Sequence, residues 1–252
     1  LAARAPGQKV ALRRSRSGAN ESNRTIDPSY KAGATVVDVS ELDAVVEVDA
    51  EAMLMHVEPG LPMDELVARA LPHGVVPAVV PEFPGITVGG ALAGGALESS
   101  SHAHGHFFDT VAEVDCITAD GVLRERLSGG DADAERAELF HSLDASYGTQ
   151  AIVTRVALRL APAPPFVACR YLHYATFEAM AAAIEALAAC PGAPTFLDGL
   201  ALGPRSFVAV VGDACAAPPP GAPRLSLRGA RTDPWFYWHL SALCAEGGAK
   251  WP

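Results

Sequence analysis

Apolar and polar residues alternate along the first part of the chain in short runs that predict β-strands. Three such runs occur within residues 36–57, and acidic residues around Asp49 separate the last two. Runs of this kind, broken by polar turn residues, are typical of strands joined by a hairpin. Residues 63–71 place their apolar side chains on one helical face, and Pro72 and Gly74 follow them. We therefore expect strands and then a short amphipathic helix.

The middle of the chain carries Asp120-Gly121 between two apolar runs, residues 111–118 and 122–127, which predicts a β-hairpin. Residues 136–143 favour a helix, and residues 152–160 alternate as a half-buried strand does. The proline-rich segment 161–165 cannot continue a strand ladder, so it is the predicted boundary between domains at 1–161 and 166–252.

The second domain begins with a β-α-β-β pattern that the sequence does not complete. An extended run at 166–174 precedes a helix at 177–190 and a hairpin around Gly203 with its return strand at 207–211. The aromatic residues 235–238 come next, as a possible lining of a sterol or flavin pocket or as core and interface residues. Because the chain starts at Leu1 and stops at Pro252, we expect further sequence at both ends.

Composition narrows the class of partner. The 252 residues are 50% hydrophobic, enough for a sizeable core, and carry a formal net charge of -10, which disfavours nucleic acid. The five cysteines are scattered and predict reduced structural thiols. The longest charge-free apolar stretch, residues 83–97, is shorter than the roughly 20 residues that a membrane span needs.

Residues 81–108, PEFPGITVGGALAGGALESSSHAHGHFF, are the most informative part of the sequence. Gly89, Gly90, Gly94 and Gly95 lack side chains, which lets backbone amides approach a bulky anion such as a pyrophosphate. The serines that follow add hydroxyl donors. The spacing matches neither a Rossmann fingerprint nor a P-loop, so a closely packed structural turn is the alternative.

The same segment, followed by TADG and SYGTQAIVTRVALRLAPA, resembles the FAD-binding half of the delta(24)-sterol reductases, the Diminuto-type family of PCMH-type flavoproteins. VDAEAMLMHVEPGLPMDELVARALPHG extends the resemblance upstream, and FLDGLALGPRSFVAVVGDA and DPWFYWHL extend it downstream. The resemblance implies an α+β fold, with a PCMH-type FAD-binding domain of two α/β subdomains followed by the start of an α+β cap domain.

The resemblance also implies which residues contact FAD. Residues 87–99 match the FAD-binding segment, and Gly148 and Ile152 match a second approach to the isoalloxazine, for which a turn glycine and a buried strand residue are the alternative. The implied set is Thr87, Val88, Gly89, Gly90, Ala91, Leu92, Gly94, Gly95, Glu98, Ser99, Ser100, His102, Gly148 and Ile152.

The N-terminal phosphate loop departs from the PCMH pattern. Residues 9–12 predict its strand and residues 16–23 the loop, which contains a single glycine. Ser17, Ser22 and Asn23 can donate hydrogen bonds to phosphate, and an ordinary solvated turn is the alternative.

Three histidines, His102, His104 and His106, would share one face of an extended segment and there resemble metal ligands. Gly105 disturbs that geometry, and only His102 matches the family pattern SSSH. We therefore expect no metal site, and a flavin-proximal or structural role for His102.

The resemblance implies non-covalent FAD, NADPH as reductant and reduction of the delta(24) double bond of a sterol side chain, since the cofactor supplies the hard chemistry. It also implies a small apolar substrate and association with a membrane, at the endoplasmic reticulum. The sequence assigns no catalytic residue. Two alternatives remain open: a flavin oxidase or dehydrogenase acting on an alcohol, hydroxy acid or sugar, and an inactive FAD-binding fragment.

Overall fold

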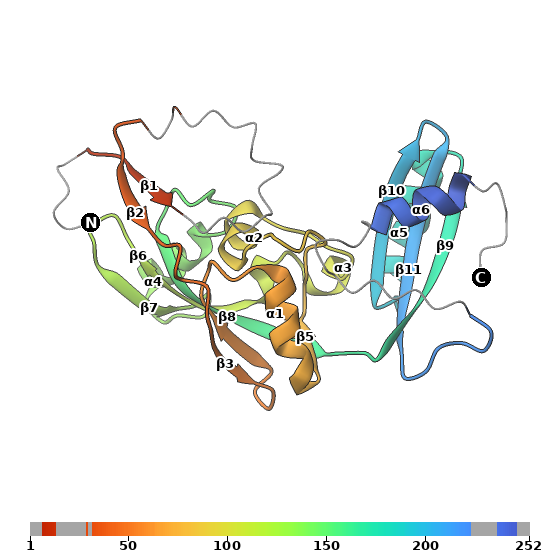
Figure 1. Ribbon diagram of the computed structural model, residues 1–252, viewed down its shortest axis with the longest axis horizontal. Helices are drawn as coiled ribbons and strands as arrows, with labels where there is room; N and C mark the ends of the chain where they lie inside the picture. The colour runs from red at the N-terminus through yellow and green to blue at the C-terminus, as the bar shows by residue number, and fades with distance from the viewer. Residues whose placement is uncertain (1–6, 14–28, 30–31, 223–235, 246–252) are drawn as a thin grey trace. The chain divides into compact units, whose positions relative to one another are not determined.

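The computed structural model describes residues 7–13, 29, 32–222 and 236–245 (Figure 1). The chain divides into two compact units, Leu1–Leu97 with Gly105–Pro162, and Glu98–His104 with Ala163–Pro252. The short segment Glu98–His104 therefore packs with the second unit, although the residues before and after it pack with the first.

The first unit contains a parallel strand pair and a larger antiparallel sheet. β1 (Val10–Arg13) and β2 (Thr35–Asp38) form the pair. The larger sheet has the order β3-β4-β8-β6-β7, and β5 also pairs with β8. Its strands are β3 (Val45–Asp49), β4 (Leu54–Val57), β5 (Val75–Pro77), β6 (Val111–Ile117), β7 (Leu123–Leu127) and β8 (Ile152–Pro162). The long strand β8 therefore lies inside the sheet, where it pairs with β4, β5 and β6.

Short helices complete the core of the first unit: α1 (Met63–Ala70), η2 (Leu71–His73), α2 (Val88–Gly94), η3 (Phe108–Thr110) and α4 (Ala134–Ser142). Leu66 of α1 is fully buried with Met55 of β4 and Phe107, because the apolar face of the helix packs on the sheet. Cys116 also lies in this core, where burial raises the pKa of its thiol to about 11 and keeps it protonated.

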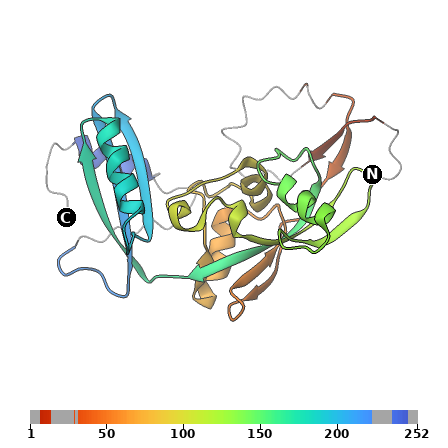
Figure 2. The same ribbon diagram turned by 180° about the vertical axis from the view of Figure 1, so that it is seen from behind.

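The second unit places one helix on each face of a three-stranded antiparallel sheet. β9 (Phe166–Tyr174) is followed by α5 (Phe177–Ala188), β10 (Phe196–Gly203), β11 (Ser206–Cys215) and α6 (Phe236–Ala245), with the strand order β10-β11-β9. α5 covers one face (Figure 2), where a Cβ atom at Gly199 would lie 3.2 Å from Met180. Leu240 of α6 packs on Val208 and Val210 of the other face. The segment Glu98–His104 adds the one-turn helix α3 (Ser101–His104) to this unit.

The structure confirms the predicted strands around residues 36–57, the helix that starts at Met63, the hairpin at Asp120-Gly121 and the β-α-β-β order of the second unit. One prediction is wrong. β8 continues through Ala161 and Pro162, which pair with Val76 and Val75. Proline lacks an amide donor but keeps its carbonyl acceptor, so it can end a strand against the three-residue strand β5. Of the helices within the described ranges, none has the length and apolar content that crossing a bilayer requires.

The carboxyl group of Asp198, on β10, predicts a pH-dependent stability. Its burial raises its pKa, and the hydrogen bond from the Gly199 amide, at 2.6 Å, opposes that shift. Because the pKa is higher in the folded state, ionising the group costs native stability as the pH rises through it. We expect Asp198→Asn to raise the free energy of unfolding at neutral pH, with the gain shrinking at acidic pH. Urea unfolding at both pH values measures this, and a gain that does not depend on pH contradicts it.

Candidate functional site

The glycine-rich segment forms the helix α2, and the amides at its start are already paired. The Thr87 hydroxyl accepts a hydrogen bond from the Gly90 amide at 3.2 Å. The amides of Val88 and Gly89 donate to the carbonyl groups of Leu61 and Pro59, at 2.9 and 2.8 Å. The glycine content of this segment suggested that these amides bind a phosphate. In this structure they are instead paired within the fold.

The four predicted glycines differ in what their missing side chains allow. A Cβ atom at Gly89 would lie 2.9 Å from Pro59, and one at Gly90 would lie 3.1 Å from the Thr87 hydroxyl. Gly95 adopts a φ of 65° as the cap of α2, with Ala145 3.3 Å from the position of a Cβ atom. Around Gly94, by contrast, no described atom outside the helix lies within 4 Å of that position. Gly94 is therefore the one of the four whose missing side chain leaves open space, and its contact with FAD stays a prediction.

The C-terminal end of α2 meets residues 145–148, which carry the second predicted approach to the flavin. The Tyr147 amide donates to the Ala93 carbonyl at 2.8 Å, and the Ala145 amide donates to the Leu92 carbonyl at 3.3 Å. The backbone has positive φ at Ala145 (46°), Tyr147 (53°) and Gly148 (72°). A non-glycine residue in this region costs on the order of 1–3 kcal/mol, and such strain concentrates at functional sites. The two hydrogen bonds bring Gly94 close to Gly148, although these residues are far apart in sequence.

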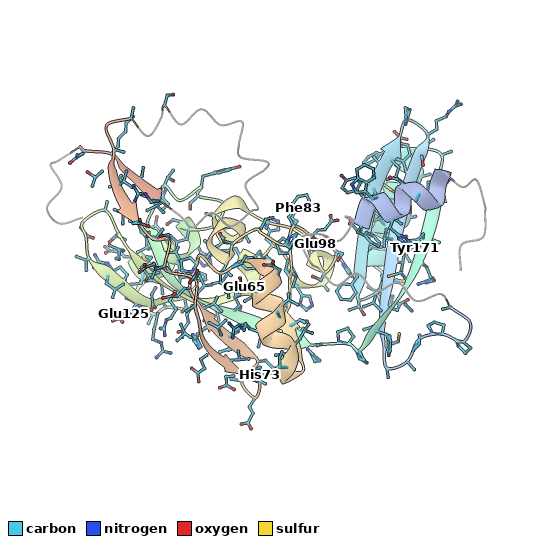
Figure 3. The ribbon with its side chains drawn as sticks, viewed as in Figure 1. Glu65, His73, Phe83, Glu98, Glu125 and Tyr171 are labelled. Carbon is cyan, nitrogen blue, oxygen red and sulfur yellow. The ribbon has the colours of Figure 1, made fainter. Side chains whose placement is uncertain are left out.

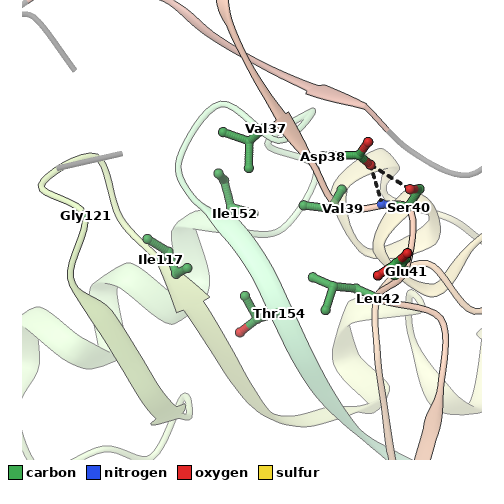
Figure 4. A pocket seen from close by; sticks show the side chains of 10 residues that line it. All are labelled: Val37, Asp38, Val39, Ser40, Glu41, Leu42, Ile117, Gly121, Ile152 and Thr154. Carbon is green, nitrogen blue, oxygen red and sulfur yellow. Dashed lines mark hydrogen bonds between the residues drawn. The ribbon is translucent and has the colours of Figure 1, made fainter. Parts of the chain in front are cut away.

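A groove of about 790 Å³ lies in the same unit, between the end of β2 and the starts of β8 and the β6–β7 turn (Figure 4). Its lining consists of Val37, Asp38, Val39, Ser40, Glu41, Leu42, Ile117, Gly121, Ile152 and Thr154. Ile152 is the predicted cofactor residue that it contains. The remaining lining residues were not singled out from the sequence, although a polar run directly after a strand was a usable signal.

Asp38 gives the groove a fixed negative charge. Its carboxylate accepts hydrogen bonds from the Ser40 hydroxyl (2.6 Å) and the Ser40 amide (3.0 Å), and these bonds hold its pKa below the usual range. Arg13 pairs with it at 3.2 Å. An ionised carboxylate accepts hydrogen bonds from a sugar hydroxyl or an amine and repels phosphate. Because Arg13 pairs with this carboxylate, the groove carries a positive and a negative charge side by side at the ends of β1 and β2.

The groove lies at the carboxyl edge of the parallel pair β1–β2. Arg13, the last residue of β1, is in register with Asp38, the last residue of β2. Ligands of α/β proteins bind outside this edge of parallel strands. The predicted loop with Ser17, Ser22 and Asn23 follows Arg13 in the chain but lies outside the described residues, so its phosphate contacts stay a prediction.

One turn connects the groove to α2. The Gly60 amide donates to the carbonyl of Leu42, a lining residue, at 2.6 Å, while the adjacent Pro59 carbonyl accepts the Gly89 amide. At the other end of α2, the 145–148 loop leads directly into Ile152 on β8. The groove, α2 and the loop therefore form one continuous region of the first unit.

The predicted residues Val88, Ala91 and Leu92 have their side chains in the core of the first unit. Any contact with a cofactor at these positions has to use the backbone. Their burial explains why the helix keeps apolar residues between its glycines.

The serine and histidine residues after α2 belong to the second unit. Ser99 contributes its carbonyl, which accepts the Leu197 amide at 2.7 Å, and Ser100 is 4% exposed. Glu98, labelled in Figure 3, accepts a hydrogen bond from the Ser99 amide at 3.0 Å. Their contacts with FAD stay predictions.

The ring of His102 bridges two carbonyl groups. Its Nδ1 lies 3.1 Å from the Ser99 carbonyl oxygen, and its Nε2 lies 2.8 Å from that of Pro194. Both partners are carbonyl acceptors, so which ring nitrogen donates depends on the tautomer. These bonds give His102 a structural role within the second unit.

His102 and His104 lie on α3, so the extended geometry in which the three histidines would share one face is not formed. Residues two apart on a helix point to different sides, so they do not share a face. In the part of the chain that the structure describes, no three His, Cys, Asp or Glu side chains are placed to hold a metal.

The FAD binding domain family matches residues 2–126. The chain therefore carries a PCMH-type FAD-binding domain. It is 28% identical over 220 residues to delta(24)-sterol reductase from Arabidopsis thaliana, covering 84% of this chain and 38% of that protein. The enzyme of the same name from Pisum sativum is 33% identical over 135 residues, covering 54% of this chain and 23% of that protein.

The chain is also similar to an oxidase. Decaprenylphosphoryl-beta-D-ribose oxidase from Mycolicibacterium smegmatis is 29% identical over 137 residues, covering 54% of this chain and 29% of that protein. The chain spans less than two fifths of the length of each of these relatives. They support an FAD-binding protein related to oxidoreductases, with a PCMH-type α+β fold.

A matched pair of glycine variants separates a glycine that leaves space for a ligand, Gly94, from a glycine that the packing of α2 requires, Gly89. Gly94→Ala should stabilise the flavin-free protein by about 0.5–1 kcal/mol, because alanine favours a helix, and weaken FAD binding by filling the open space. Gly89→Ala should instead destabilise the protein, because the new methyl group meets Pro59. Chemical unfolding and FAD titration measure both effects. Unchanged FAD affinity in Gly94→Ala removes Gly94 from the site.

Proposed function

We propose that this protein is an FAD-dependent oxidoreductase that reduces the delta(24) double bond of a sterol side chain, with NADPH as the source of electrons. The first unit is assigned to FAD binding and the second to a cap that takes part in substrate binding. The proposal rests on the groove and the region around α2, together with the similarity to the delta(24)-sterol reductases.

The observation that favours a reductase is the extent of the match to the Arabidopsis thaliana enzyme. The first unit consists of one range of 97 residues and one of 58. Together these are fewer than the 220 residues that match the Arabidopsis thaliana enzyme. The match therefore extends beyond Pro162 into the second unit, whereas a match of 137 residues, such as that to the oxidase, is short enough to lie within residues 1–162. Substrate preference lies outside the shared cofactor scaffold, so similarity in the second unit supports the reductase.

When bound, FAD supplies the redox chemistry, accepting a hydride from NADPH and passing one to the carbon–carbon double bond, with a proton completing the reduction. The residues described here contribute binding and orientation. Gly94 leaves room for the approach of a ligand, and Asp38 offers an ionised acceptor at the groove.

The second candidate is an oxidase of an alcohol or sugar on the same scaffold, which the similarity to decaprenylphosphoryl-beta-D-ribose oxidase favours. The two candidates differ in what reduces the flavin. NADPH reduces it in a reductase, while the alcohol substrate itself does so in an oxidase.

The proposal includes an apolar sterol as ligand and association of the protein with a membrane, at the endoplasmic reticulum. A sterol partitions into lipid, so an enzyme acting on it works at a membrane surface. Fractionation of cells that express the protein, followed by its detection in the microsomal and soluble fractions, measures this.

The purified protein should contain FAD that is not covalently bound. The α2 region offers close backbone approach, and no residue of it is assigned to a flavin linkage. Acid precipitation should leave a yellow supernatant and a colourless pellet. Colour retained by the pellet contradicts non-covalent binding, and a protein without flavin that takes up none on titration contradicts the proposed function.

Anaerobic mixing with NADPH should bleach the flavin, and a panel of alcohols, hydroxy acids and sugars should not. With desmosterol present, mass spectrometry should then detect the product of hydrogen addition to the double bond. Bleaching by an alcohol and not by NADPH supports the oxidase instead.

A further inference from the structure

Tyr147 is the most exposed large hydrophobic residue of the described chain. Its side chain is 82% exposed. Among the described residues, no aromatic ring packs on it. A ring of this size contributes to stability mainly when it is buried, so this placement does nothing evident for the isolated fold.

The backbone nevertheless holds Tyr147 firmly. Its amide donates to the Ala93 carbonyl at 2.8 Å, so the residue is anchored to the last turn of α2. Its φ of 53° is the left-handed conformation that glycine or asparagine adopts more readily. An aromatic residue kept exposed in an unfavourable conformation indicates selection for a role outside the fold itself.

The position next to Tyr147 is open. Gly94 directly follows the residue whose carbonyl binds the Tyr147 amide, and no described atom outside the helix lies within 4 Å of where its Cβ atom would be. An anchored aromatic residue beside an open glycine is an arrangement suited to a flat ring. On the proposed function, the flat ring is the isoalloxazine of FAD.

We propose that Tyr147 is a positioning residue whose phenol ring contacts the isoalloxazine ring of FAD beside Gly94. This inference rests on the proposed function and adds a residue to the cofactor site. The ring contact orients the flavin, and because tyrosine is an electron donor it also quenches the flavin fluorescence.

The experiment compares the parent with Tyr147→Leu, Tyr147→Phe and Tyr147→Gly. FAD titration gives the dissociation constant, and emission of the bound flavin reports on ring contact. Tyr147→Leu should weaken FAD binding about tenfold, as expected for the loss of an aromatic pair, and should raise the emission several-fold. Tyr147→Phe should keep most of the affinity and also raise the emission, because phenylalanine stacks but does not quench.

Tyr147→Gly and a control variant in the second unit separate the effect of ring contact from an effect on folding. Tyr147→Gly relieves the strained φ, so its flavin-free form should unfold at a higher temperature than that of Tyr147→Leu while FAD binding is equally weak. Tyr174→Leu, at the end of β9 in the second unit, is the matched tyrosine control and should change neither the affinity nor the emission.

The outcomes distinguish the two proposals. If the parent binds FAD and Tyr147→Leu leaves both affinity and emission unchanged, the Tyr147 inference is overturned and the proposed function stands. If the parent binds no FAD on titration, both fail.

Discussion

Backbone hydrogen bonds at both ends of α2 fix the arrangement of the whole candidate site in the first unit. At its start, the Gly89 amide binds the Pro59 carbonyl, and the neighbouring Gly60 amide binds Leu42 of the groove. At its end, the carbonyl groups of Leu92 and Ala93 receive the 145–148 loop. A seven-residue helix thus positions both the turn at Pro59 and Gly60, which precedes it in sequence, and the 145–148 loop, which follows it. Its buried side chains tie the same region to the core.

This pairing changes where an anionic ligand can find donors. The amides of Val88, Gly89 and Gly90 are used within the fold, and Asp38 brings negative charge to the groove. The pairing of these amides shifts the expected phosphate contacts to other residues, and the loop with Ser17, Ser22 and Asn23 follows β1 in the chain. A glycine-rich sequence can therefore mark a ligand site without supplying the phosphate donors itself.

The sequence was sufficient to predict most elements, because hydrophobic periodicity and turn residues are local signals. Met63 and its apolar face predicted α1, and Asp120-Gly121 predicted the β6–β7 hairpin. It was not sufficient for Pro162, whose pairing depends on β5, or for His102, whose ring contacts the carbonyl group of Pro194, 92 residues away in sequence. The groove residues around Asp38 were missed for the same reason, since a cavity is formed by segments that only the fold brings together.

The division of the chain into two units affects how variants of residues 81–108, the segment that resembles an FAD-binding motif, are interpreted. The stretch that most resembles an FAD-binding motif is continuous in sequence, yet α2 packs with the first unit and Glu98–His104 with the second. His102 binds the carbonyl groups of Ser99 and Pro194, so replacing it removes hydrogen bonds that hold the second unit together. Each such bond contributes about 1 kcal/mol, comparable with the effect of a lost cofactor contact. Loss of flavin in a His102 variant therefore does not by itself identify a flavin ligand, whereas loss in Gly94→Ala, whose fold should be more stable, does.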